Sequence, residues 1–258
     1  MNFIYDIIVV GGGHAGCEAA SAAARMGAKT LLVTMDMTKL AQMSCNPAMG
    51  GIAKGQIIRE IDAMGGMSGI ITDRTMIQFR MLNRSKGPAM WSPRAQCDRM
   101  LFSREWRKVL EGTDNLHIWQ EQATELIIEE KKVSGVVTSF GTRFLSKAVI
   151  LTNGTFLNGL MHVGFRTTTG GRSGDQDSKG LSDQLRTLGF TVERLKTGTS
   201  ARVDGRSVDF SAMTEQPGDY DGRCFSYLND EVRINDPRSC YITHTNENVH
   251  QELRDGLK

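Results

Sequence analysis

Three glycines near the start of the chain constrain its fold more than any other feature. They are Gly11, Gly13 and Gly16, and they have the spacing Gly-x-Gly-x-x-Gly. An apolar, β-branched run over residues 5–10 precedes them, and an alanine-rich run over residues 17–26 follows. This order predicts a buried parallel strand, a tight turn and a helix. With a second strand over residues 29–34 it predicts a Rossmann-type βαβ unit.

The turn predicts a dinucleotide site. The first glycine permits the tight turn, the second lets the backbone approach a pyrophosphate, and the third lets helix and strand pack closely. The helix N-terminus adds free N–H groups and the positive end of its dipole. The cofactor-binding residues predicted here are Gly11, Gly12, Gly13, His14, Ala15 and Gly16. The ribose contact stays open between Thr34, where the strand ends, and Asp36, which has the expected spacing.

The composition fits a soluble globular protein in a reducing compartment. Of 258 residues, 40% are hydrophobic and 23% are charged. No long apolar run predicts a membrane span, and the first residues lack the basic region of a signal peptide. The five cysteines are scattered without a C-x-x-C pair, which argues against a disulfide framework or a metal site. We therefore expect a cytoplasmic protein with no metal and no membrane contact.

Four strand-like runs follow in the second third of the chain, over residues 116–120, 124–129, 133–139 and 143–152. We predict a β-meander at about 116–152, ending in Thr152-Asn153-Gly154. A Rossmann unit, a meander and a strand ending in Thr-x-Gly resemble the α/β fold of glutathione-reductase-type FAD-binding proteins. That resemblance favours FAD over NAD and implies that the backbone near Ala123 contacts adenine.

The loop at residues 44–55, Ser-Cys-Asn-Pro-Ala-Met-Gly-Gly-Ile-Ala-Lys-Gly, contains the best candidate for catalysis. Its proline and paired glycines predict irregular structure, and a helix follows with Ile57, Ile58, Ile61 and Met64 on one face. A cysteine close to a helix N-terminus tends toward the reactive thiolate, which makes Cys45 a candidate nucleophile. The alternative is a buried structural cysteine.

Seven motifs together resemble one family. They are GGGHAGCEAA, SCNPAMGGIAKG, LNRSKGPAMWSPRAQCDR at 82–99, ILTNGTFLNG at 150–159, GGRSGD at 170–175, LKTGT at 195–199 and CYITHTN at 240–246. In this order they resemble the MnmG (GidA) family of FAD-dependent tRNA-uridine modification enzymes, over essentially the whole chain. The resemblance implies that, with the GTPase MnmE, the enzyme adds an aminomethyl or carboxymethylaminomethyl group at C5 of the wobble uridine. It also implies methylenetetrahydrofolate as one-carbon donor, NADH as reductant and a homodimer with a helical C-terminal domain.

The resemblance also implies roles for single residues. Ser178 matches a position that contacts FAD, and Cys45 matches one of two cysteines that the family needs for activity. Cys45 is expected to add to C6 of the uracil, which makes C5 nucleophilic. Its neighbours Asn46, Gly50, Gly51 and Lys54 are expected to line the flavin side of the pocket.

The stretch from Arg74 to Lys108 holds nine basic residues and two acids, a balance that suits phosphate contact. The predicted RNA-binding residues are Arg80, Arg84, Lys86, Arg94 and Arg99, with Lys86 alternatively serving the flavin pocket. A solvated basic face is the competing interpretation. Trp91 is expected in the core rather than as a platform for a base.

The chain departs from the family in two ways. Ser200 and Ala201 replace two prolines of the family's LKTGTPPR motif, and family members are more than twice as long. We divide the chain into an FAD-binding domain, 1–200, and the beginning of an inserted NAD-side domain, 201–258, with a helix over 249–258. We expect an N-terminal fragment that is inactive alone. One alternative is an FAD-binding module without catalysis. A second is an NAD(P)H–disulfide oxidoreductase, but Cys45 has no partner cysteine for a redox pair. A third is the folate- and FAD-dependent tRNA methyltransferase family, whose members do not have the SCNPA and SKGPA runs found here.

Overall fold

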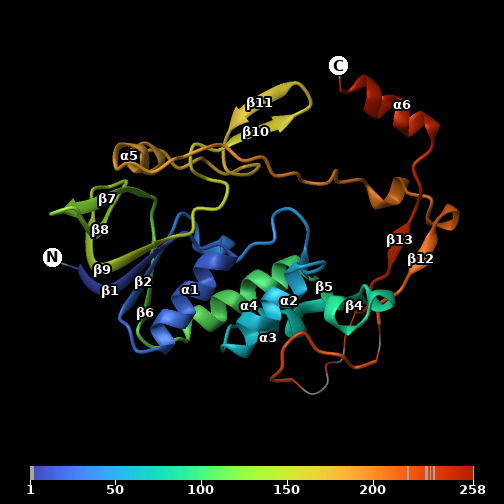
Figure 1. Ribbon diagram of the computed structural model, residues 1–258, viewed down its shortest axis with the longest axis horizontal. Helices are drawn as coiled ribbons and strands as arrows, with labels where there is room; N and C mark the ends of the chain where they lie inside the picture. Colours follow the sequence, from blue (N-terminus) through green and yellow to red (C-terminus); the bar gives the residue numbers. More distant parts are fainter. Residues whose placement is uncertain (1–2, 220, 230–231, 233, 235, 258) are drawn as a thin grey trace.

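A computed structural model describes residues 3–219, 221–229, 232, 234 and 236–257 (Figure 1). Its largest element is a six-stranded sheet in the order β6-β2-β1-β9-β8-β7. Strands β1 and β2 are parallel, and β1 is also parallel to β9. The strands of this sheet are β1 (Phe3–Val10), β2 (Thr30–Thr34), β6 (Leu116–Gln120), β7 (Ala123–Glu129), β8 (Lys132–Thr138) and β9 (Arg143–Leu151).

The first βαβ unit is confirmed. Helix α1 (His14–Arg25) directly follows the glycine turn and connects β1 to β2, which ends at Thr34 as predicted. All five residues of β2 are buried, as expected for a parallel strand covered on both faces.

The predicted start of the meander was wrong. Strand β6 pairs with β2 in parallel and forms the edge of the Rossmann sheet. Within this sheet, the antiparallel neighbours among the described residues are β7, β8 and β9. The difference has a topological cause. Helix α4 (Arg99–Glu111) precedes β6, and parallel neighbours need such a crossover connection, whereas short turns join β7, β8 and β9.

Two hydrophobic clusters cover the faces of this sheet. On one face, Cys17 and Ala20 of α1 pack with Phe102, Trp106 and Leu110 of α4. On the other, Leu181 of α5 (Leu181–Thr187) packs with residues of the strands and the meander. The sheet therefore has α1 and α4 on one face, and side chains of the meander with α5 on the other, which makes a layered α/β domain.

A second, smaller sheet lies beside this domain, in the order β3-β5-β4. It contains β3 (Ala48–Gly50), β4 (Met76–Leu82) and β5 (Ser92–Cys97), with helices α2 (Lys54–Ala63) and α3 (Ser68–Thr75) against it. The predicted apolar face of α2 was partly wrong, since Ile57 is 55% exposed and Met64 is 81% exposed. Gly55 instead lets α2 approach β5, because a Cβ there would lie 2.4 Å from the Pro93 carbonyl oxygen.

Parts of the remaining chain extend away from both sheets (Figure 1), whereas α5 packs on β7 and Phe225 is buried in the core beside the second sheet. A hairpin of β10 (Leu160–Val163) and β11 (Arg166–Thr169) is followed, after α5, by a long segment without regular structure. Strands β12 (Thr214–Gln216) and β13 (Cys240–Ile242) pair with each other, and the chain ends with α6 (Glu247–Asp255). Short 3-10 turns complete the elements: η1 (Met37–Lys39), η2 (Arg84–Lys86), η3 (Pro88–Met90), η4 (Gly205–Ser207) and η5 (Phe210–Ala212).

The predicted C-terminal helix begins two residues earlier than expected, and Lys258, its predicted last residue, lies outside the described residues. Among the residues that the structure describes, no helix has the length and apolar character needed to cross a bilayer.

Candidate functional site

The glycine turn leaves no room for side chains at two of its three motif positions. Gly11 has φ +109°, and a Cβ there would lie 2.4 Å from the carbonyl oxygen of Thr152. A Cβ on Gly16 would lie 1.8 Å from the carbonyl oxygen of Gly11. Gly12 is also enclosed, by Leu40 and Thr34. These contacts give the tight turn and the close helix packing that the spacing predicted.

Gly13 differs from its neighbours because a Cβ there would meet nothing within 4 Å. It is the N-cap residue of α1, with φ −77°, and no side chain caps the helix. The open side of Gly13 therefore borders an uncapped helix N-terminus, where N–H groups and the helix dipole favour an anion. These residues fit the pyrophosphate of a dinucleotide.

His14 and Ala15, also predicted for this site, open α1. Nε2 of His14 lies 2.9 Å from the Ala41 carbonyl oxygen. Burial lowers the pKa of His14, and the hydrogen bond to Ala41 opposes that shift only in part. His14 is therefore neutral near pH 7 and donates through Nε2. The contact ties the glycine turn to the loop that leads to Cys45.

Cys45 lies in that loop and is exposed. Strand β3 separates it from α2, so the expectation that it sits at a helix N-terminus was wrong. The expectation of a buried structural cysteine fits other positions better, because burial raises the pKa of Cys17 and of Cys97 to about 12. Those two thiols stay protonated at neutral pH, whereas Cys45 is open to reagents and substrates.

The segment at residues 194–202 crosses over Cys45. The thiol of Cys45 donates to the Gly198 carbonyl oxygen at 3.2 Å. The Arg202 guanidinium donates to the carbonyl oxygens of Cys45 and Ser44. Arg194 anchors the start of the segment on the Asn158 carbonyl oxygen at 3.1 Å. The LKTGT motif and the SCNPA motif therefore meet in space, although the sequence separates them by about 150 residues.

A second arginine holds the Cys45 loop from the other side. Nη1 of Arg172 donates to Gln42 and to the Ser44 hydroxyl, each at 2.6 Å. Its Nε donates to Asp175 at 2.5 Å, and Asp175 also pairs with Lys39. Sequence reasoning missed Arg172 and Arg202 as site residues. The GGRSGD motif and the retained arginine after LKTGT were the available signals.

Ser178 and Ala123, predicted to contact FAD, lie close together at the start of β7. Ser178 is 4% exposed, and its hydroxyl accepts from Gln122 at 3.3 Å. Ala123 follows Gln122 and opens β7. The structure therefore brings these two predicted residues together, next to Gln122, which the sequence did not single out.

The two candidates for the ribose contact differ in their surroundings. Thr34 is buried at the end of β2. Asp36 lies beyond the strand, where its carboxylate accepts from the Thr38 backbone at 2.8 Å and pairs with Lys39 at 3.1 Å. The Thr38 hydroxyl, as the largest cause, lowers the pKa of Asp36. The carboxylate is thus ionised and already partnered, and the choice between the two residues stays a prediction.

The other residues predicted for the flavin side are spread along β3. Asn46 is exposed beside Cys45. Gly50 and Gly51 have φ of +81° and +100° and lie against Pro93 of β5, and Lys54 begins α2. The structure therefore places Asn46 with Cys45 and the other three at the far end of β3.

The five predicted RNA-binding residues also divide into two groups. Arg80 and Arg94 lie directly opposite each other on β4 and β5 and are half-buried, as is Arg99. Arg84 and Lys86 are exposed in η2. Arg84 pairs with Asp219 at 2.8 Å and with Asp221 at 3.5 Å. The stretch is therefore not one continuous basic surface.

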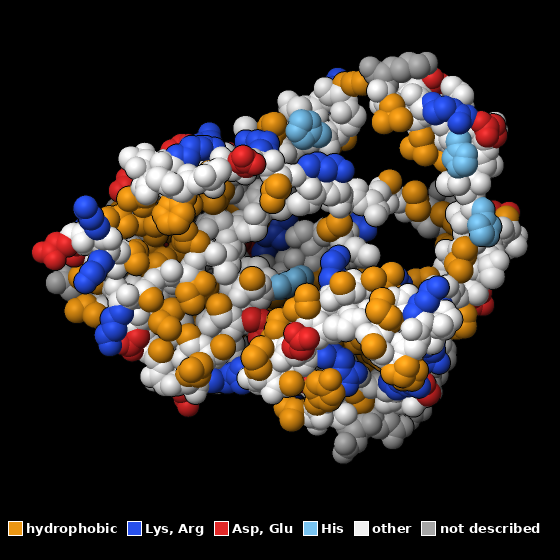
Figure 2. Space-filling model, viewed as in Figure 1, with side chains coloured by type: hydrophobic (Ala, Val, Ile, Leu, Met, Phe, Trp, Pro, Cys, Tyr) orange, Lys and Arg blue, Asp and Glu red, His pale blue; other side chains and the backbone are white. Residues whose placement is uncertain are grey.

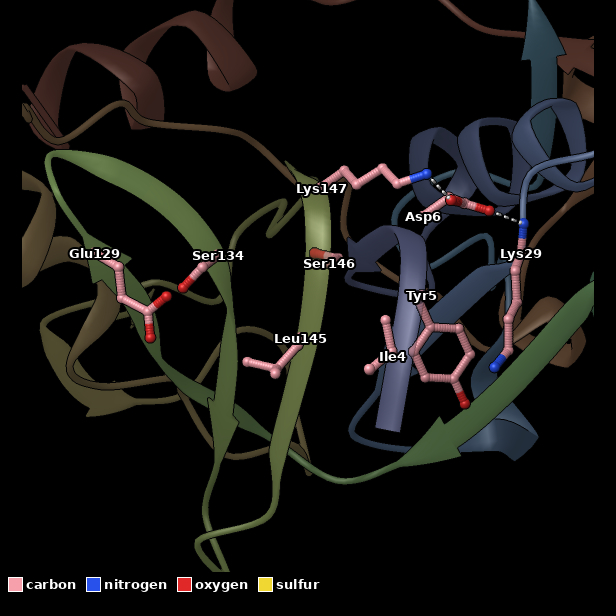
Figure 3. A pocket seen from close by; sticks show the side chains of 9 residues that line it. All are labelled: Ile4, Tyr5, Asp6, Lys29, Glu129, Ser134, Leu145, Ser146 and Lys147. Atoms are coloured by element: carbon pink, nitrogen blue, oxygen red, sulfur yellow. Dashed lines mark hydrogen bonds and ion pairs between the residues drawn. The ribbon is translucent and has the colours of Figure 1, made fainter. Parts of the chain in front are cut away.

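One cavity of about 450 Å³ lies away from all of these groups (Figure 3). It is lined by the start of β1 and by β9, at the opposite end of the sheet from the glycine turn. Asp6 there accepts from Lys147 at 2.6 Å and from the Lys29 backbone at 2.9 Å. Since ligands of open α/β sheets bind at the carboxyl ends of parallel strands, this cavity is not the dinucleotide site.

The fold and the glycine turn define the class: an α/β protein with a Rossmann-like domain of the FAD-binding type. Solved structures agree. The chain matches GidA from Aquifex aeolicus with a TM-score of 0.92 and 46% identity over 97% of this chain. It also matches the GidA-related protein from Thermus thermophilus with a TM-score of 0.54 and 25% identity.

The chain belongs to the family described as glucose inhibited division protein A, whose model matches residues 6–258. It is 60% identical over 257 residues to the tRNA uridine 5-carboxymethylaminomethyl modification enzyme MnmG of Parabacteroides distasonis. It is also 60% identical over 253 residues to the protein of that name from Flavobacterium johnsoniae. The chain spans about two fifths of the length of these relatives, 41% in each case.

Proposed function

We propose that this chain is the N-terminal, FAD-binding part of an enzyme that modifies C5 of the wobble uridine of tRNA. The observation that supports this most is the convergence of three distant segments on Cys45: the loop from the glycine turn, Arg172 of GGRSGD, and residues 198–202. The tRNA substrate follows from the names of the relatives. The family further suggests MnmE as partner, methylenetetrahydrofolate as one-carbon donor, NADH as reductant, a homodimer and a cytoplasmic location.

FAD fits the open side of Gly13, where Gly11, Gly12, His14, Ala15 and Gly16 shape the turn. When bound, FAD would supply redox chemistry to the reaction. Ser178 and the backbone at Ala123 would contact its adenosine part, with Thr34 or Asp36 at the ribose. Asn46, Gly50, Gly51 and Lys54 would lie toward the flavin.

Cys45 would act as the nucleophile. Its thiolate sulfur forms a bond to C6 of the uracil, and the C5–C6 π electrons move to C5. C5 then attacks the electrophilic methylene carbon of the one-carbon donor, and the C=N π electrons move onto the donor nitrogen; an incoming amine would later replace that nitrogen and release the folate. Loss of the proton at C5 and release of the Cys45 thiolate restore the double bond. The Gly198 carbonyl must leave the thiol before this attack, because a carbonyl oxygen accepts from a thiol and repels a thiolate.

Phosphate contacts would come mainly from Arg84 and Lys86, the two exposed members of the predicted RNA-binding set. Arg80, Arg94 and Arg99 are half-buried, so we expect them to contribute less to binding. Residues 201–258 would begin the NAD-side domain of the longer enzyme.

The test is Cys45→Ser in the full-length enzyme that carries this chain. We expect tRNA modification to fall by about a hundred-fold or more, with FAD still bound, because a serine hydroxyl is a much weaker nucleophile than a thiolate. Cys240→Ser is the matched control, since Cys240 contacts Gln78 and Arg94 away from Cys45. Full activity in Cys45→Ser would overturn the proposed role.

A further inference from the structure

Trp91 is on the surface rather than in the core, contrary to the expectation from its type. Trp91 lies in the connection from β4 to β5, just after η3, and the residue is 37% exposed. Exposing a large aromatic ring costs hydrophobic free energy, so an exposed tryptophan in a fixed orientation points to an interaction.

Several hydrogen bonds fix the position of Trp91. Its indole N–H donates to the Arg84 carbonyl oxygen at 3.3 Å, and its backbone N–H donates to that of Pro88 at 3.2 Å. Gln56 of α2 donates to the Trp91 carbonyl oxygen at 3.1 Å. The ring is therefore held in place before any ligand binds, which lowers the entropy cost of binding.

One cation contacts the ring, and two more lie in the turn that holds it. The Arg223 guanidinium lies 5.9 Å from the ring centroid, a cation–π distance. Lys86 is exposed in η2, and Arg84 is the residue whose carbonyl accepts the indole N–H. Asp221 and Asp219 offset part of this charge, since Asp221 pairs with Arg223 at 2.9 Å and both acids pair with Arg84. Figure 2 shows Lys and Arg side chains interleaved with hydrophobic ones over the end of the molecule that holds β4 and β5.

Trp119 provides a contrast within the same chain. It is also 37% exposed, but it lies on the edge strand β6 of the other sheet. Its indole N–H donates to the Glu121 carboxylate at 2.9 Å. Its ring packs on Phe144 at 5.2 Å and Phe3 at 6.1 Å. Trp119 therefore belongs to an aromatic cluster beside an acid, a setting that disfavours phosphates.

We propose that Trp91 is a stacking platform for a base of single-stranded RNA, with Lys86, Arg84 and Arg223 beside the neighbouring phosphates. An exposed, fixed aromatic ring among cations is the arrangement by which proteins bind unpaired nucleotides. The proposal rests on the proposed function in one respect only, the choice of RNA as the ligand.

The platform is separate from the reacting base. The Cys97 backbone N–H donates to the Pro47 carbonyl oxygen, close to Cys45, whereas Trp91 precedes the other end of β5. At about 3.3 Å per residue, the distance from Cys97 to Trp91 is about 20 Å. A base on Trp91 is thus a few nucleotides away from the uridine at Cys45.

Tryptophan fluorescence tests the platform directly, because Trp106 is fully buried and Trp119 can be replaced. We would titrate the chain with twelve-residue oligoadenylate RNA and follow its emission. Stacking on Trp91 predicts quenching in Trp119→Phe and none in Trp91→Phe. Heparin, a polyanion without bases, should compete for binding without quenching. Quenching that persists in Trp91→Phe, or equal quenching by heparin, would overturn the proposal.

Affinity gives a second measurement. Trp91→Ala should weaken RNA binding about 5- to 150-fold, the range for one base stack, while Trp119→Phe stays within about twofold. Lys86→Gln should lower the salt dependence of RNA binding. Lys131→Gln, in the β7–β8 turn, is the control and should leave it unchanged. No RNA binding by the unmodified chain, or an equal RNA affinity in Trp91→Ala, would overturn the proposed platform. The Cys45→Ser experiment judges the proposed function independently of this result.

Discussion

The β1–α1–β2 unit of the six-stranded sheet and the core of the three-stranded sheet differ in the sequence distance over which their stabilising contacts act. In the first, β1, the glycine turn, α1 and β2 follow one another, and Gly16 packs on Gly11 five residues away. In the second, Phe225 is fully buried against Gly50 and Phe79. Asp73 of α3 accepts from the Phe225 backbone at 2.6 Å, across 152 positions of sequence. The first unit supplies the nucleotide turn, whereas Cys45 is contacted by Gly198 and Arg202 from more than 150 residues away, so the candidate site combines a local part with a long-range part.

The largest effect is expected where the local packing is tightest. Gly16→Val should destabilise the chain by more than about 4 kcal/mol, because the new side chain must displace the Gly11 backbone. Gly13→Ser, in the same turn but with open space around its Cβ, should change stability by no more than about 1 kcal/mol. Urea denaturation measures both. Equal losses in the two variants would contradict the geometry of the turn.

Phe225→Ala should show whether the two sheets lose stability independently. Loss of this side chain leaves a cavity against Gly50 and Phe79, with a cost of about 3–5 kcal/mol. Because the contact belongs to the second sheet, hydrogen exchange should speed up for the amides of β4 and β5 more than for those of β1 and β2. Uniform loss of protection in both sheets would show that they unfold as one unit.

His14 gives the smallest expected effect, a pH dependence. Burial holds its folded pKa below the unfolded value of about 6.5, so the unfolded chain binds more protons at acidic pH. The contribution of His14 to stability is therefore present above that value and decreases as the pH falls below it. His14→Gln should reduce this loss by less than about 1 kcal/mol. His162→Gln, at an exposed position of β10, should leave it unchanged.

The sequence was sufficient for the parts of the molecule that short-range rules determine. The glycine spacing and the β-branched run predicted β1, α1 and the end of β2. The pairing of β6 was missed because a strand pattern carries no information on which neighbour it joins. The buried face of α2 was predicted only in part, since Ile58 packs against the core but Gly55 and Asp62, rather than Ile57 and Met64, are its buried residues.

The candidate site was likewise predictable where it depends on local motifs, but not where distant segments meet. Motif reasoning selected Cys45 and the glycine turn, and the structure shows the cysteine exposed beside residues 198–202. The contacts of Arg172 and Arg202 with the Cys45 loop depend on how distant segments cross, which no local pattern encodes. The surface position of Trp91 likewise depends on Arg84 and Gln56, which hold its loop in place.

FAD binding at Gly13 is the central claim, and equilibrium dialysis read at the flavin absorbance tests it most directly. Gly13→Asp should keep the fold, because aspartate is a good N-cap for α1, while its carboxylate takes the place of the pyrophosphate. Gly205→Asp is the matched control, since a Cβ there also meets open space. We predict at least tenfold weaker FAD binding in Gly13→Asp and unchanged binding in Gly205→Asp. FAD binding by Gly13→Asp equal to that of the unmodified chain, or none by the unmodified chain, would contradict the account.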